Sequence, residues 1–258
     1  MTQTAFKTVD ELKRNFPEAF KPDGSVSFDK IAGAEFITQL PDNWKLEKSL
    51  YLTGLKSLKA LPAGLSVPCR LEINRCGALE SLPADLHVAE RIEVISCHSL
   101  KQIADGIHSP KGMSFSDCPS LGKLPTALDV DYLRIVGCNS LRTIEGGVNV
   151  NKVLVVSECS EFKSFPEGWT IKGSLLLSSC PALSVLPENF SIGGDLEVND
   201  CQNIRRLPDD LKVGQTIYIE DCDGIEIPQA LESTGIDIRY PDNFAVSPAP
   251  DQDTSLSP

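Results

Sequence analysis

Eight of the nine cysteines in this 258-residue chain recur at one position of a repeated pattern. Their spacing is 21 residues, apart from one step of 20 between Cys118 and Cys138. Thiols can act as nucleophiles, bind zinc or form disulfides, so the regularity raises the question of which chemistry they serve. The eight residues are Cys76, Cys97, Cys118, Cys138, Cys159, Cys180, Cys201 and Cys222.

The way in which this position varies favours packing over chemistry. Leu55 fills the position in the first copy of the pattern, and Ala34 fills it in a degenerate earlier copy. Metal ligands must converge at one point, whereas one cysteine per repeat is spread along the molecule, and no C-x-x-C pair is present. A free cysteine packs as a small, weakly polar hydrophobe. We therefore predict a structural cysteine ladder inside a solenoid, with no metal, no cofactor and no catalytic residue.

The elements that position these cysteines can be read from the full pattern, L-x-[IVL]-x-x-C-x-x-L-x-x-L-P-x-x-L-x-V-x-x-x. The alternating apolar start of each copy predicts a short strand with one buried face, and adjacent copies would pair in parallel. The Leu-Pro step favours an extended or turn-like return, because proline fixes φ and lacks an N–H donor. Trp44, Trp169 and Phe190 occupy a position that leucine fills elsewhere, so we predict that they are core residues. The nine copies begin at Leu50, Leu71, Ile92, Met113, Leu133, Leu154, Leu175, Leu196 and Ile217.

With nine copies, the pattern resembles bacterial leucine-rich-repeat proteins, of the short-repeat kind with L-x-L-x-x-C strands and an L-P-x-x-L-x-V return. It is also similar to the repeat regions of bacterial effectors injected into host cells, although their strands more often end in asparagine. The resemblance implies a leucine-rich-repeat solenoid with a parallel β-sheet on its concave face, short turns with extended or 3-10 segments on its convex face, and protein binding on the concave sheet. Some of these relatives carry a C-terminal ubiquitin-ligase domain. The 18 residues after the last predicted strand leave no room for one, so we expect a non-enzymatic protein.

The two ends of the chain depart from the pattern, as caps that cover apolar edges must. Residues 1–49 are predicted to form an N-terminal cap and a degenerate repeat, whose first half could be strand or helix. Within this cap, Thr8 to Glu11 has capping-box spacing and could start a short helix that reaches about Asn15. Residues 50–240 are predicted to form the solenoid, with nine repeats and a last strand. Residues 241–258, rich in proline, serine and aspartate, are predicted to form a disordered tail.

The composition and net charge of the chain limit the kinds of molecule that it is expected to bind. Hydrophobic residues make up 41% of the chain but aromatic residues only 6%, so the predicted core is aliphatic. The formal charge is −12, and an acidic surface repels phosphate backbones and anionic lipids, so we expect no nucleic-acid partner. No apolar run approaches the roughly 18 residues of a membrane span, and the N-terminus lacks the apolar region of a Sec signal. Together with the resemblance, this favours the bacterial cytoplasm, or delivery into a host cell without a cleaved Sec signal.

The candidate binding site comes from strand residues that point away from the core and so line one surface. Val136, Val153, Val155 and Leu176 are apolar at positions expected to face solvent. An apolar centre with a polar rim is typical of protein interfaces. We therefore predict that another protein, of unknown identity, docks on the concave face, with Val155, Leu176 and Tyr218 as anchors. The predicted partner-binding residues are Tyr51, Glu72, Glu93, Arg134, Val136, Val155, Leu176, Glu197 and Tyr218.

Three alternatives stay open at this point. Parallel sheets favour β-branched residues, so exposed valines need not mark a contact. An apolar sheet face could instead pair with its own copy, which would make the protein a homodimer or a self-associating scaffold. A thiol-dependent enzyme is the third alternative. Cys69 lies beside Arg70, which could lower the pKa of the thiol, and Cys97 precedes His98, although neighbouring residues at a strand end point apart.

Overall fold

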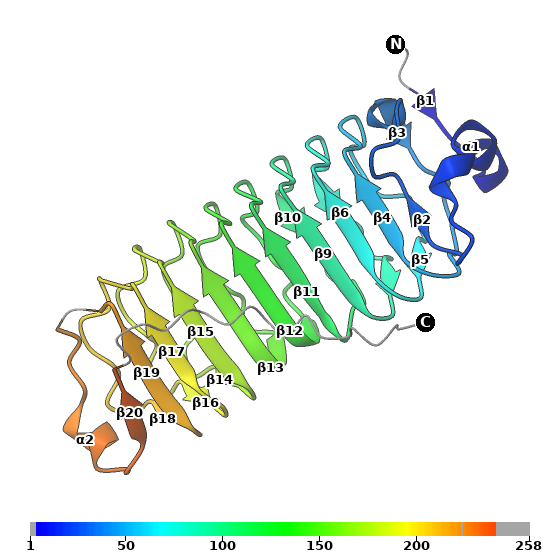
Figure 1. Ribbon diagram of the computed structural model, residues 1–258. Helices are drawn as coiled ribbons and strands as arrows, with labels where there is room; N and C mark the ends of the chain where they lie inside the picture. Colours follow the sequence, from blue (N-terminus) through cyan, green and yellow to red (C-terminus); the bar gives the residue numbers. More distant parts are fainter. Residues whose placement is uncertain (1–3, 223, 241–258) are drawn as a thin grey trace.

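The computed structural model describes residues 4–222 and 224–240, which form an elongated parallel β-solenoid (Figure 1). Each turn of the chain adds one strand to a main sheet that runs the length of the molecule, which confirms the predicted parallel pairing. Over these described residues the main sheet has eleven strands, in the order β2 (Val26–Ser27), β4 (Leu50–Thr53), β6 (Leu71–Asn74), β9 (Arg91–Ile95), β11 (Gly112–Ser116), β12 (Leu128–Val136), β13 (Val148–Ser157), β15 (Ser174–Ser178), β17 (Leu196–Asn199), β19 (Thr216–Glu220) and β20 (Asp237–Arg239).

The return side of the turns carries shorter strands that also pair in parallel. The predicted extended return is therefore confirmed. The predicted 3-10 segments do not occur within the repeats, since the described chain forms 3-10 helices only at η1 (Pro17–Ala19) and η2 (Ala34–Phe36). The paired return strands are β5 (Ser66–Val67) with β8 (His87–Val88), β7 (Ser81–Leu82) with β10 (Gln102–Ile103), and β14 (Thr170–Ile171) with β16 (Ser191–Ile192) and β18 (Lys212–Val213).

The N-terminal end is closed by a short helix, α1 (Val9–Asn15), as the capping-box spacing predicts. The Thr8 Oγ1 accepts a hydrogen bond from the backbone N–H of Glu11 at 3.2 Å, which satisfies one of the donors left open at a helix start. Next to the helix, β1 (Thr4–Ala5) pairs with β3 (Ile37–Gln39). The first half of the degenerate repeat is strand, because β2 pairs with β4 as the first strand of the main sheet.

The C-terminal end adds a one-turn helix, α2 (Gln229–Glu232), and the last strand β20. The predicted last strand is confirmed, since β20 pairs in parallel with β19. The predicted tail at residues 241–258 lies outside the described residues. Within the part that the structure describes, no helix is long and apolar enough to cross a membrane.

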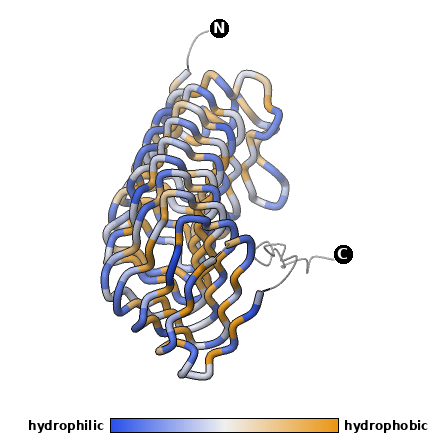
Figure 2. Tube along the Cα trace, turned by 90° about the vertical axis from the view of Figure 1, so that its left-hand side faces the viewer, coloured by the Kyte–Doolittle hydropathy of each residue, from blue (hydrophilic) through white to orange (hydrophobic). Residues whose placement is uncertain are grey.

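The core is a continuous apolar column between the main sheet and the return strands. Figure 2 shows hydrophobic positions recurring at the same point of successive turns. Trp44, Trp169 and Phe190 are buried, as predicted. The rings of Trp169 and Phe190 stack with centroids 6.2 Å apart, and the Trp169 Nε1–H donates to the Val148 carbonyl at 3.0 Å. The indole therefore packs without leaving its one polar group unsatisfied.

The cysteines form a regular ladder inside the solenoid, as predicted, and all eight are buried. Their sulfur atoms lie 3.3–3.9 Å from carbonyl oxygens of the preceding turn at Cys76, Cys97, Cys118, Cys138, Cys159, Cys180 and Cys222. A thiol is a weak hydrogen-bond donor, so the cysteine is more than an apolar filler. It also gives a weak donor to a carbonyl where the strand ends.

The residue before each ladder position has a left-handed backbone conformation, with a positive φ. This feature was not predicted from the sequence. The φ angles range from 46° to 72°, a region that glycine adopts readily and that costs other residues roughly 1–2 kcal/mol. The left-handed residue turns the chain out of the sheet and directs the next side chain into the core. The residues are Gly54, Arg75, Ser96, Asp117, Gly137, Glu158, Ser179, Asp200 and Asp221.

The single 20-residue step removes a residue from one corner of the solenoid. Two residues, Asp131 and Tyr132, separate the buried Val130 and Leu133, whereas other turns have three residues at this corner. In this turn and in the next, the chain continues as one strand from the return side into the main sheet, and β12 pairs with β13 on both sides of an irregularity between Val130 and Tyr132.

Candidate functional site

The strand residues that point away from the core form straight rows across the main sheet. We call this surface the open face, and the row through the middle of the strands the centre row. Neighbouring members of the centre row are direct register partners in successive strands. The structure thus places the predicted binding residues on one face. The centre row consists of Tyr51, Glu72, Glu93, Ser114, Arg134, Val155, Leu176, Glu197 and Tyr218.

The open face has a shallow hollow of about 10 Å³ over four consecutive strands, β13, β15, β17 and β19. Four centre-row residues line this hollow: Val155, Leu176, Glu197 and Tyr218. Polar residues border them, including Ser178 and Glu220 of the adjacent row. Four of the nine predicted binding residues therefore meet in one depression. The other five are Tyr51, Glu72, Glu93, Arg134 and Val136, which lie on the open face outside it.

Val155 does not face solvent as expected. Its exposed fraction is only 4%, although it points away from the core. The longer side chains of its register neighbours, Arg134 and Leu176, flank it on both sides. Val155 therefore forms the floor of the hollow, while Leu176 and Tyr218 stay half-exposed and can be reached by a partner.

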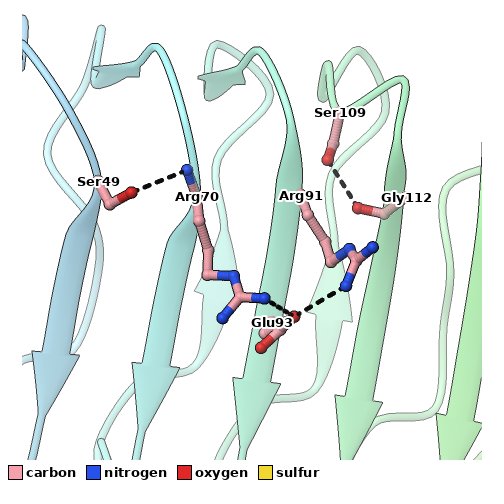
Figure 3. Close-up of polar contacts among 6 residues, drawn as sticks. All are labelled: Ser49, Arg70, Arg91, Glu93, Ser109 and Gly112. Atoms are coloured by element: carbon pink, nitrogen blue, oxygen red, sulfur yellow. Dashed lines mark hydrogen bonds and ion pairs between the residues drawn. The ribbon is translucent and has the colours of Figure 1, made fainter. Parts of the chain in front are cut away.

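The charges near the N-terminal end of the open face are neutralised within the chain (Figure 3). Arg70 and Arg91 both direct their guanidinium groups at Glu93, with N–O distances of 3.3 Å and 3.6 Å. Arg91 and Glu93 lie on β9, and Arg70 lies immediately before β6. Burial and the nearby Glu93 carboxylate raise the pKa of Glu72. This end of the face is thus a self-contained charge cluster.

Near the C-terminal end, the hollow contains a carboxyl group without such neutralisation. Within the described part of the chain, Glu197 makes no hydrogen bond or ion pair. Burial, together with the nearby Asp195 carboxylate, raises the pKa of Glu197 to about 6. Glu220, on the adjacent row, accepts a hydrogen bond from the Asn199 side chain at 2.9 Å. The hollow therefore joins an apolar floor to an acidic side.

Most ladder thiols are poorly suited to nucleophilic chemistry; the exception in pKa is Cys76, whose pKa is lowered by a hydrogen bond with the Cys97 side chain. Burial raises the pKa of Cys159 to about 11 and that of Cys118, Cys180 and Cys201 to about 12. A thiol needs its thiolate form to attack an electrophile or bind a metal. Cys69 lies outside the ladder and is half-exposed.

Metal-ligating side chains do not gather elsewhere on the described surface. Over residues 4–222 and 224–240, no group of three or more His, Cys, Asp or Glu side chains could hold a metal ion. His87 and His108 lie 4.5 Å apart on the return side, with their rings stacked in parallel. Parallel rings do not point their nitrogen atoms at a common point, so this pair is a surface stack.

Two features of the site lie outside the predicted list of binding residues. The hollow includes polar residues of the adjacent row, such as Ser178, Asn199 and Glu220, which the predicted site omits. The residue before the first apolar position of each repeat also matters, because its side chain can reach the neighbouring turn. Ser174 accepts a hydrogen bond from the Asp195 N–H at 3.0 Å, and Asp195 accepts one from the Thr216 N–H at 3.0 Å. The 21-residue repeat carries this signal, since it aligns these positions directly.

No protein-family model matches this chain, and a comparison with curated proteins gives no match.

Proposed function

We propose that this chain is a leucine-rich-repeat protein that binds another protein on the open face of its main sheet and has no enzymatic activity. The observation that carries the proposal is the hollow across β13, β15, β17 and β19, with Val155 and Leu176 on its apolar side. A half-exposed apolar group bordered by polar side chains is the usual anatomy of a protein interface.

Both the sequence pattern and the shape of the molecule favour this role. The repeat with its cysteine position and its Leu-Pro return supports the leucine-rich-repeat assignment. A solenoid of stacked turns also presents a long, continuous surface, which suits recognition of an extended or large partner. Delivery into a host cell stays a prediction from the resemblance, as does self-association.

The buried thiols weigh against the enzymatic alternative. The raised pKa values of Cys118 and Cys159 disfavour their thiolate forms at neutral pH, and although a hydrogen bond with Cys97 lowers the pKa of Cys76, that thiol is fully buried and out of reach of a substrate. The half-exposed Cys69 lies in the corner between β5 and β6 and does not line the hollow.

Capture of partners by the purified chain tests the proposal. We expect a Leu176→Arg variant to lose partner proteins that the natural chain captures from bacterial and host-cell lysates. Leu176 is preferred to Val155 for this test, because an arginine in place of the buried Val155 would disturb the fold itself.

Val185 provides a matched control. It is an apolar residue with 61% of its surface exposed, and it lies away from the hollow. A Val185→Arg variant therefore adds the same charge without touching the open face. Partners that bind the natural chain and Val185→Arg, but not Leu176→Arg, support the proposal, whereas equal capture by all three proteins contradicts it. Circular dichroism establishes beforehand that the variants are folded.

A further inference from the structure

Glu93 and Glu197 occupy the same position of the repeat but have opposite surroundings. Each lies on the centre row, in the second position of its repeat. The arginines that neutralise Glu93 are Arg91, the first residue of its own strand, and Arg70, the residue before the preceding strand. The equivalent residues around Glu197 are Asp195 and Ser174.

The turn that carries Glu197 thus has the carboxylate of the cluster in Figure 3 but not its cations. One arginine is replaced by a hydroxyl group and the other by a second acid. Because Glu197 lies in the hollow, it is also half-buried. A half-buried carboxylate without an ion pair is unfavourable, and a cation brought to it by a partner would be stabilised.

The rest of the hollow is complementary to a cation beside an apolar group. Leu176 is the register partner of Glu197 on one side, and Tyr218 is its register partner on the other. The Tyr218 ring already attracts a guanidinium, since the Arg239 side chain lies 5.8 Å from its centre. Arg239 itself forms an ion pair with Asp237 at 2.7 Å. Among the described residues, the other charged groups that lie close to Glu197 include the carboxylates of Asp195 and Glu220.

We propose that the partner is a protein segment in which a lysine or arginine lies close to an apolar side chain. The apolar side chain packs on Leu176, and the cation pairs with Glu197, in the role that Arg70 and Arg91 play for Glu93. This rests on the proposed function and specifies the chemistry of the partner. The formal charge of −12 points the same way, because it attracts a basic segment and opposes a second copy of this chain on the same face.

A library of random 12-residue peptides displayed on phage tests the proposal with the full chain as the target. Neighbouring strands lie about 4.8 Å apart and an extended chain rises about 3.3 Å per residue. We therefore expect the enriched peptides to carry a lysine or arginine within two or three positions of an apolar residue. Their affinities are then measured by fluorescence anisotropy with labelled synthetic copies.

Three variants locate the interaction. Glu197→Gln should weaken the binding of these peptides about tenfold, the size expected for one charge-assisted hydrogen bond. Asp195→Arg should weaken it at least as much, because the new arginine would neutralise Glu197 from within the chain, as Arg91 does for Glu93. Glu188→Gln is the control for the loss of one carboxylate, at an exposed position that lies outside the hollow and outside the predicted binding residues, and it should leave affinity unchanged.

The possible outcomes separate this inference from the proposed function. Peptides that bind the natural chain but not Leu176→Arg, yet show no enrichment of basic residues or no response to Glu197→Gln, would overturn the cationic partner and leave the binding face intact. If no enriched peptide depends on Leu176, both proposals fall. Circular dichroism of every variant shows that a loss of binding is not a loss of fold.

Discussion

The sulfur of Cys180 lies 3.6 Å from the carbonyl oxygen of Val156 on the preceding turn. It also lies 3.3 Å from the carbonyl of Ser178 within its own turn. The ladder cysteines from Cys76 to Cys180 are thus each set between two strand ends, in a space where a thiol packs as an apolar group and points its weak donor at oxygen. Leu55 can replace it at the first turn, where the same position is fully buried.

Alkylation should distinguish the ladder from the remaining cysteine. With iodoacetamide at pH 8, we expect Cys69 to react rapidly in the native protein, because it is half-exposed. The eight ladder thiols should react only after unfolding, since all of them are buried and burial also raises the pKa of Cys118 and Cys180. Mass spectrometry counts the labels. Rapid labelling of more than one cysteine in the folded protein would contradict the buried ladder.

The same thiols predict a loss of stability at alkaline pH. In the folded state, burial raises the pKa from 9.0 to about 11 for Cys159 and about 12 for Cys118. Above pH 9 the unfolded chain therefore binds fewer protons than the folded one, so the free energy of unfolding falls as pH rises. Each thiol contributes a slope of about 1.4 kcal/mol per pH unit between its unfolded and folded pKa values.

Urea unfolding between pH 8 and pH 11 measures this slope. Lysine and tyrosine also titrate in part of this range, so the comparison with a variant is decisive. A Cys118→Ala variant removes one thiol from the ladder, and Ala34 shows that alanine fits the equivalent position. We expect its slope to be shallower by the contribution of one thiol. An unchanged slope would show that the titration of Cys118 does not contribute to the pH dependence of the free energy of unfolding.

The stacked aromatic rings around Trp169 should contribute strongly to the free energy of unfolding. Trp169 packs on Phe165 and Phe190 with centroid distances of 5.9 Å and 6.2 Å, and it is almost fully buried. A Trp169→Ala variant should lower the free energy of unfolding by about 3–5 kcal/mol, because it leaves a cavity and frees the Val148 carbonyl. Val185→Ala, at an exposed position, should change it by less than about 0.5 kcal/mol. Equal effects in urea titrations would refute the stacked core.

Two glycines give a matched test of the left-handed corner. An added Cβ would meet open space at both Gly54 and Gly77, but only Gly54 has a positive φ, at 72°. We expect Gly54→Ala to destabilise the protein by about 0.5–1 kcal/mol, since alanine is strained there. Gly77→Ala should be neutral or stabilising by up to about 1 kcal/mol, because it restricts only the unfolded chain. Thermal unfolding followed by circular dichroism compares them, and identical midpoints would exclude backbone strain as the cause.

The hollow should bind its basic partner in a pH-dependent way. The raised pKa of Glu197, about 6, means that this carboxyl group takes up a proton as the pH falls through that value. A protonated Glu197 no longer attracts a cation, so affinity for basic peptides should fall between about pH 7 and pH 5 and level off above pH 7. Glu197→Gln should bind weakly at every pH in this window. A fall of equal size in the variant would assign the effect to another group.

The fold was largely predictable because one pattern recurs nine times. The alternation around Leu71 and Ile73, repeated every 21 residues, allows only strands that stack in parallel, and both residues are fully buried. The capping-box spacing at Thr8 likewise predicted α1, because the hydrogen bond that starts the helix is local in sequence.

The left-handed backbone conformation before each ladder position was not predictable in the same way. Glycine or aspartate stands before several ladder cysteines, but Arg75 and Glu158 occupy the same left-handed position. Neither residue type favours a positive φ, so no local preference reveals the corner there. The stacking of neighbouring turns holds these residues in place, and that constraint appears only in the assembled solenoid.

The site was predicted in outline but not in its balance of charge and exposure. The rows followed from strand geometry alone, so the alignment of Leu176, Glu197 and Tyr218 could be foreseen. The burial of Val155 could not, because it depends on the lengths of the side chains in two neighbouring strands. The difference in ion pairing between Glu93 and Glu197 could be established only from three-dimensional distances. The two arginines that pair with Glu93 come from different turns.

A surface built from equal turns offers a ligand the same contacts at every turn. A ligand that recognised only the repeat could bind at any turn and slide from one to the next by a single strand spacing. The apolar floor at Val155 and Leu176 occurs at two successive turns, and the unneutralised Glu197 follows immediately beside it. These three residues break the translational symmetry of the open face. An otherwise periodic surface therefore has one preferred binding position and one preferred orientation for a bound partner.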